Sequence, residues 1–249
     1  MSTSADRLSR SRPAVVTGTI GLGVAGLLVG FLIAVVGISL AAAVFPSIEQ
    51  NSAPALAIAT AGQGIGIAIV AVGYLRYRGL SWSFLRVRMP TLRDVGWTIG
   101  VTIGLFAALF VAVTIIEWLG LSAAEHSVAE AAEDDPLVLL PLVPLSILVT
   151  GPAEELLYRG VIQTRLRKIF DAASAVLVAS VIFAVVHIPA YATEGLGPEL
   201  LTTLGILLLL GGFLGAVYEH TGNLLVPAVA HGLYNAIVFG GNIASGLTI

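Results

Sequence analysis

The stretch GPAEELLYRG, residues 151–160, places two carboxylates and one guanidinium inside a long apolar segment. Residues 138–164 contain no other charged side chain. A run of this length and composition is typical of a helix that crosses the hydrocarbon core, which needs about 20 residues. A charged side chain in the middle of such a helix costs about 2.5–3.5 kcal/mol on insertion scales. The three charges therefore need compensation, and they are the first candidates for a functional role.

The whole chain has the composition of an integral membrane protein. Of its 249 residues, 57% are hydrophobic and 11% are charged, and the mean hydropathy is +0.98. Soluble domains have about 25% charged residues. The net charge of −3 gives no indication of a nucleic-acid partner. Because the chain has no cysteine, disulfides, thiolate metal ligands and a cysteine nucleophile are excluded.

Seven apolar segments are long enough to be membrane helices, which predicts an all-α polytopic transmembrane helix bundle. They are residues 16–45, 53–75, 96–116, 138–164, 173–190, 200–218 and 223–243. Lys and Arg near the ends of spans stay on the cytoplasmic side, and all of them except Arg159 fall in alternate loops. We therefore expect a cytoplasmic N-terminus. The acidic segment 117–135 is then an external loop, and its His126 is predicted to be an ordinary surface histidine.

The two adjacent glutamates of the opening stretch are predicted to differ. Neighbouring residues on a helix point about 100° apart, whereas residues four apart share a face. Glu155 therefore lies over Arg159, which predicts a structural ion pair. Glu154 is left as a carboxylate available for proton transfer. The alternative is that all three side chains form a buried structural cluster.

Two later spans place polar side chains at the same helical spacing. In FAVVH, Phe183 and His187 are four residues apart, and in HGLYN, His231 and Asn235 are four apart. A glutamate and two histidines can activate water, and an asparagine beside a histidine can donate hydrogen bonds to an oxyanion. Amide hydrolysis needs both functions. The chain has no HExxH, no GxSxG and no pair of intramembrane aspartates, so other protease designs are absent.

These three motifs resemble the CAAX prenyl protease and bacteriocin-processing family of intramembrane proteases, also called CPBP or Abi proteins. The family pattern of EExxxR, FxxxH and HxxxN, each on its own membrane helix, occurs here in order. The run TGNLLVPAVAH, residues 221–231, is also similar to the family's approach to its last histidine. Many members have eight spans, so seven or eight are expected. We predict a cytoplasmic tail (1–15), N-terminal transmembrane helices (16–120) and a CPBP-like catalytic core (136–243).

The resemblance implies an intramembrane endopeptidase that cleaves a membrane-associated protein or peptide. At the motif positions, Glu154 would activate water with help from His187, and His231 with Asn235 would stabilise the oxyanion. Glu155 and Arg159 would support the site. Family members have been described both as metalloproteases and as metal-free glutamate proteases.

If zinc is bound, its ligands would be Glu154, His187 and His231. We favour the metal-free version, because ligands on three helices would need matched depths. No other cofactor is implied.

Two other classes of function fit the same polar residues. Intramembrane Glu, His and Arg can also relay protons in a proton-coupled transporter. A non-catalytic membrane immunity or scaffold protein would keep the fold without turnover. The excess of Arg over Lys favours a GC-rich, prokaryotic source, so a prokaryotic cell membrane is the expected location.

Overall fold

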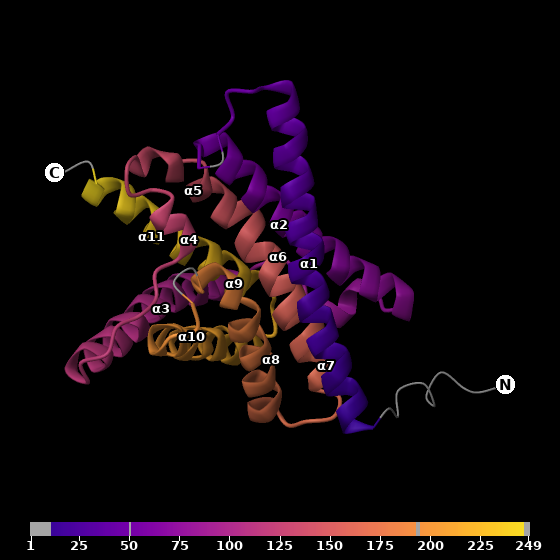
Figure 1. Cartoon of the computed structure of the whole chain (residues 1–249). Coiled ribbons are helices and arrows are strands. Elements are labelled where there is room, and N and C mark those ends of the chain that lie inside the picture. The colour runs from indigo at the N-terminus through magenta and orange to yellow at the C-terminus, as the bar shows by residue number, and fades with distance from the viewer. Residues whose placement is uncertain (1–10, 50, 193–194, 247–249) are drawn as a thin grey trace.

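The computed structural model describes residues 11–49, 51–192 and 195–246, and in these residues it contains helices and no strand (Figure 1). The predicted all-α bundle is therefore confirmed. Most of the predicted N-terminal tail, residues 1–15, lies outside the described residues. The predicted orientation of the chain in the membrane and its division into three regions stay predictions.

Seven helical segments correspond to the seven predicted spans. Six are single helices: α1 (Arg12–Val44), α2 (Ala53–Arg78), α3 (Leu92–Trp118), α8 (Ala172–Val186), α10 (Pro198–Thr221) and α11 (Leu225–Gly246). Within the described residues, five segments are long and apolar enough to cross a membrane: α1, α2, α3, α10 and the segment Pro136–Leu166. The chain is an integral membrane protein.

The segment Pro136–Leu166 is built from six consecutive short elements. They are η2 (Pro136–Leu139), α5 (Leu142–Leu145), η3 (Ser146–Thr150), α6 (Gly151–Glu155), η4 (Leu156–Gln163) and α7 (Thr164–Leu166). The elements η3 and η4 are π-helical. Three further short elements lie in the connections: η1 (Trp82–Leu85), α4 (Ser127–Glu130) and α9 (Ile188–Tyr191).

The composite segment is the centre of the bundle. Its elements contact α1, α2, α8, α10 and α11. Figure 1 shows α6 in the middle, with α1 and α2 on one side and α3 and α10 on the other. The charged stretch 151–160 is therefore surrounded by protein on several sides.

The π-helical turns explain how the composite segment continues through a proline. Pro152 has no backbone N–H, and inside a regular helix its ring would clash with the preceding turn. Here it follows the wide turn η3 at the start of α6, and η4 follows α6 directly. Such π turns are frequent at functional sites. The two glutamates lie between them.

The fifth predicted span, residues 173–190, is shorter in the structure. The helix α8 ends at Val186, His187 is its C-terminal cap, and α9 begins at Ile188. Pro189 cannot donate a backbone hydrogen bond, and it disfavours helical geometry in the residue before it. His187 therefore lies at the C-terminal end of α8.

Candidate active site

A buried ion pair links three helical segments at the centre of the bundle. Arg159 Nη1 donates to Glu155 Oε1 over 2.7 Å, and their side chains are 1% and 0% exposed. Arg159 Nη2 donates to the Gly211 carbonyl of α10 over 2.8 Å. The guanidinium carbon lies 4.8 Å from the centroid of the Phe183 ring of α8. The pair thus joins the composite segment to α10 and α8.

His231 of α11 contacts both glutamates. Its Nδ1 lies 3.0 Å from Glu155 Oε1, which is a hydrogen bond, and its Nε2 lies 3.9 Å from Glu154 Oε2, which is too far for a direct one. Glu155 Oε1 therefore binds both Arg159 and His231. One ring nitrogen of His231 is fixed by the buried carboxylate, and the other is directed toward Glu154.

The contact between His231 and the glutamates depends on a close helix crossing. A Cβ on Gly151 of α6 would lie 2.6 Å from the Ala228 carbonyl oxygen of α11. A Cβ on Gly232 of α11 would lie 2.6 Å from the Ser146 carbonyl oxygen. Glycines let helix backbones approach this closely. The crossing brings the start of α6 and the residues beside His231 together.

The two adjacent glutamates differ in their access to solvent. The side chain of Glu154 is 12% exposed, whereas that of Glu155 is fully buried. Glu155 is hydrogen-bonded to Arg159 and to His231. Glu154 has a contact of 3.9 Å with His231, which is longer than either of these bonds. Glu154 is therefore the carboxylate that a reactant can reach.

His187 is oriented by its own helix. Its Nδ1 lies 2.7 Å from the Phe183 carbonyl oxygen, which accepts only if Nδ1 carries the proton. In the neutral ring, Nε2 is then free to accept a proton. The Phe183 ring lies 4.4 Å from the His187 ring and 6.1 Å from the His231 ring, centroid to centroid. Both histidine rings therefore lie near one aromatic ring.

The described residues show no hydrogen bond or ion pair between Glu154 and His187. Asn235 lies one turn beyond His231 on α11 and is half-buried. The structure thus brings Glu154, Glu155, Arg159 and His231 into direct contact, while His187 reaches this group through Phe183.

A zinc site is not formed by these side chains as they stand. In the part of the chain that the structure describes, no three His, Cys, Asp or Glu side chains are grouped so that they could hold a metal ion. Nδ1 of His231 is bonded to Glu155, and Nδ1 of His187 to a backbone carbonyl. We derive no chemical step through a metal.

The prediction that His126 is an ordinary surface histidine is wrong. His126 is half-buried, and its ring meets the Tyr191 ring of α9 edge to face, with centroids 4.8 Å apart. Burial lowers the pKa of His126 to about 4, and the charge of His187 lowers it further toward that value. The loop between α3 and α4 therefore packs against α9, which follows the end of α8. An acidic loop gives no sequence pattern from which this could be predicted.

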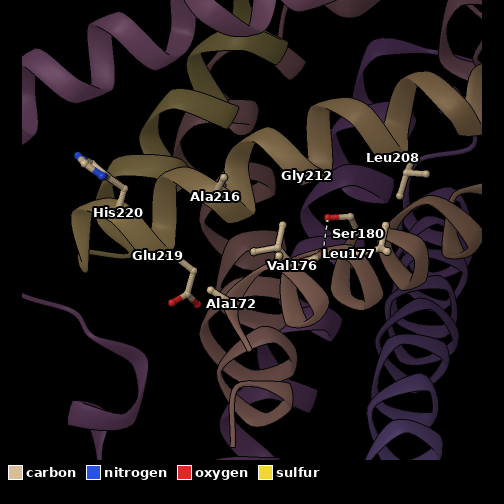
Figure 2. A pocket seen from close by; sticks show the side chains of 10 residues that line it. Ala172, Val176, Leu177, Ser180, Leu208, Gly212, Ala216, Glu219 and His220 are labelled. Atoms are coloured by element: carbon tan, nitrogen blue, oxygen red, sulfur yellow. Dashed lines mark hydrogen bonds between the residues drawn. The ribbon is translucent and has the colours of Figure 1, made fainter. Parts of the chain in front are cut away.

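A separate groove of about 600 Å³ lies between α8 and α10 (Figure 2). Small and apolar side chains line most of it, and Glu219 and His220 lie at one end. None of the six predicted site residues lines this groove. Glu219 accepts hydrogen bonds from Gln163, Arg86 and Arg167 and so has a structural role in the described part of the bundle.

Comparison with known proteins identifies the segment that holds the site. Residues 136–237 match the family described as type II CAAX prenyl endopeptidase Rce1-like. This segment, residues 136–237, is similar to that family and is called the Rce1-like segment below. The predicted resemblance to CAAX prenyl proteases is therefore confirmed, and the Rce1-like segment contains all six predicted site residues. Helices α1 to α3 lie outside it.

One curated relative matches part of the chain. The chain is 35% identical over 98 residues to "Uncharacterized protein YpbD" of Bacillus subtilis (strain 168). The match covers 39% of this chain and 44% of the relative, which is less than half of either protein. No solved structure matches the chain.

Proposed function

We propose that the chain is an intramembrane endopeptidase of the CAAX protease type, which hydrolyses a peptide bond of a membrane-associated protein or peptide. The observation that carries this proposal is the difference between two adjacent carboxylates. Glu155 is buried and bonded to Arg159 and His231, whereas Glu154 is partly exposed and faces Nε2 of His231 at 3.9 Å. One carboxylate is thus held in place, and the other is free to react.

In the proposed reaction, Glu154 is the general base. It takes a proton from a water molecule, and the oxygen of that water attacks the carbonyl carbon of the scissile bond. The free Nε2 of His187 accepts a hydrogen bond from the same water and orients it. Glu154 then returns the proton to the leaving amine, so that the carboxylate is regenerated.

The proposed oxyanion site consists of His231 and Asn235. In the imidazolium form, His231 donates from Nδ1 to Glu155 and from Nε2 to the oxyanion. The side-chain amide of Asn235 is the second donor. Removing one such donor typically slows catalysis by about 100- to 1,000-fold.

A cleavage assay on the purified full chain in lipid vesicles tests this proposal. Wild type and the variants Glu154→Ala, His187→Ala and His231→Ala are incubated with a quenched fluorescent library of membrane peptides. Glu117→Ala, which removes an exposed carboxylate at the end of α3, is the matched control. We expect cleavage by wild type and the control and its loss in the three site variants.

The same assay separates the alternatives. Cleavage that a chelator abolishes and zinc restores would contradict the metal-free mechanism. Cleavage retained in Glu154→Ala would contradict the role of that carboxylate. A folded wild type that cleaves nothing would favour a non-catalytic membrane protein.

A further inference from the structure

The inference concerns His126, and it rests on the proposed endopeptidase function. His126 belongs to the loop between α3 and α4, which is far in sequence from the Rce1-like segment's motifs. In the structure it lines a pocket and packs against Tyr191 of α9, the short helix that follows His187. None of the roles proposed above uses it.

Four contacts fix the loop that carries His126. Its Nδ1 accepts a hydrogen bond from the Val128 N–H over 3.0 Å and so caps α4. Its ring packs edge to face against Tyr191. Two residues earlier, the Ala124 N–H donates to Thr203 Oγ1 of α10 over 2.9 Å, and the Thr203 hydroxyl donates back to the Ala124 carbonyl. The loop is therefore tied to α9 and α10.

The hydrogen bond to Nδ1 decides which ring nitrogen of His126 carries the proton. Because Nδ1 accepts from a backbone N–H, the neutral ring carries its proton on Nε2. Burial lowers the pKa of His126 to about 4, so that the ring is neutral at physiological pH. Nε2 is therefore a hydrogen-bond donor without a positive charge.

His126 is also part of the wall of a pocket of about 450 Å³. The other walls come from α4, η2 and α11 and include Glu125, Leu139, Asn242 and Ser245. The mixture of polar and apolar side chains suits a peptide, which presents both backbone amides and side chains. His126 also packs against Tyr191, whose pKa is raised to about 12 by burial first and then by the nearby Tyr234 and Glu154. His126 thus lines the pocket and contacts a ring that the charge of Glu154 influences.

We propose that the pocket holds an extended peptide segment of the substrate, and that His126 donates a hydrogen bond from Nε2 to a backbone carbonyl of that segment. This contact sets where the scissile bond lies relative to Glu154. The contact contributes to substrate binding and not to the chemical step, which is carried out by the catalytic residues proposed above.

Two substitutions separate this role from the capping role of the same side chain. In His126→Asn, the amide oxygen can still accept from the Val128 N–H, but no donor occupies the place of Nε2. In His126→Gln, the amide nitrogen lies near the place of Nε2, but the cap is lost. The values of KM and kcat are measured for both variants with the best-cleaved peptide of the library.

We expect KM to rise about 3- to 10-fold in His126→Asn, as for the loss of one hydrogen bond, with kcat within twofold of wild type. We expect His126→Gln to stay near the wild-type KM. His220→Ala, a histidine at the end of the separate groove, is the control and should leave both constants unchanged. Any result in which His126→Asn has a KM equal to or lower than that of His126→Gln would overturn the proposal.

The cleavage assay distinguishes an error in this inference from an error in the proposed function. Wild type that cleaves no peptide would overturn the proposed function and this inference with it. Cleavage that depends on Glu154 but shows no difference between the Asn and Gln variants would overturn this inference alone.

Discussion

Gly151 of α6 and Gly232 of α11 lie so close that a Cβ on Gly151 would be 2.7 Å from the Gly232 backbone nitrogen. Glu154 follows Gly151 by three residues, and His231 directly precedes Gly232. The separation of the two helix backbones at this point therefore determines the separation of the proposed base and the proposed oxyanion donor.

We predict that Gly151→Ala and Gly232→Ala each reduce cleavage at least 100-fold. A methyl group at either position must push apart backbone atoms, which cannot move as a flexible side chain can. A misplacement of about 1 Å at a catalytic site can cost 100-fold in rate. Single-turnover cleavage rates and thermal unfolding of both variants check this prediction.

Gly96→Ala and Gly100→Ala on α3 are matched controls for these substitutions. No atom lies within 4 Å of a Cβ at either position. Alanine is favoured over glycine in a helix by about 1 kcal/mol, so the controls should be neutral or slightly stabilising. If the two site variants behaved like these controls, the crossing would not position the site.

The buried ion pair gives a second prediction. Arg159→Met leaves the carboxylate of Glu155 without its guanidinium, and breaking a buried pair in this way typically costs about 3–5 kcal/mol. The double variant Glu155→Gln with Arg159→Met should recover part of the loss, because the uncompensated charge is removed. Chemical unfolding of wild type, Arg159→Met and the double variant measures the free energy of unfolding of each. The exposed Arg93→Met is the control, and its stability should lie within about 0.5 kcal/mol of wild type. An Arg159→Met variant as stable as this control would contradict the structural role of the pair.

The lowered pKa of His126 predicts a pH dependence for the loop that carries it. The ring is near His187, Tyr191 and Glu130, and its pKa falls from 6.5 to about 4 on folding. The open loop therefore binds more protons than the closed loop between these values, so its stability falls as the pH is lowered from 6.5 toward 4. The protection of the backbone amides of residues 124–131 against hydrogen exchange, corrected for the pH dependence of intrinsic exchange, should fall over this range in wild type. It should change less in His126→Asn, which has no imidazole, and equal pH responses in the two proteins would contradict the assignment.

Much of the fold could be predicted from the sequence because the bilayer imposes a simple rule. Apolar runs of about 20 residues give the number and order of helices, and all seven predicted segments are helical in the structure. The fifth predicted segment runs to residue 190, whereas α8 ends at Val186. The apolar run continues as far as Pro189, so hydropathy alone does not show where the helix ends. The π-helical turns beside Gly151 have no sequence pattern comparable to the helical period.

The candidate site could be predicted in part. The spacing of Glu155 and Arg159 fixes which glutamate can reach the arginine, because this is local helix geometry. The roles of His231 and Gly211 around that pair depend on which helices pack together, and no local pattern gives this. The position of His126 depends on a loop that packs against α9, so it could be found only from the structure.

The most direct test of the account compares Glu154→Gln with Glu155→Gln in one preparation, by single-turnover cleavage and by unfolding. Both variants remove one negative charge and change the side-chain volume little. We predict that Glu154→Gln unfolds like wild type but cleaves no peptide, and that Glu155→Gln is less stable because Arg159 loses its carboxylate. Cleavage by Glu154→Gln at the wild-type rate would contradict the account.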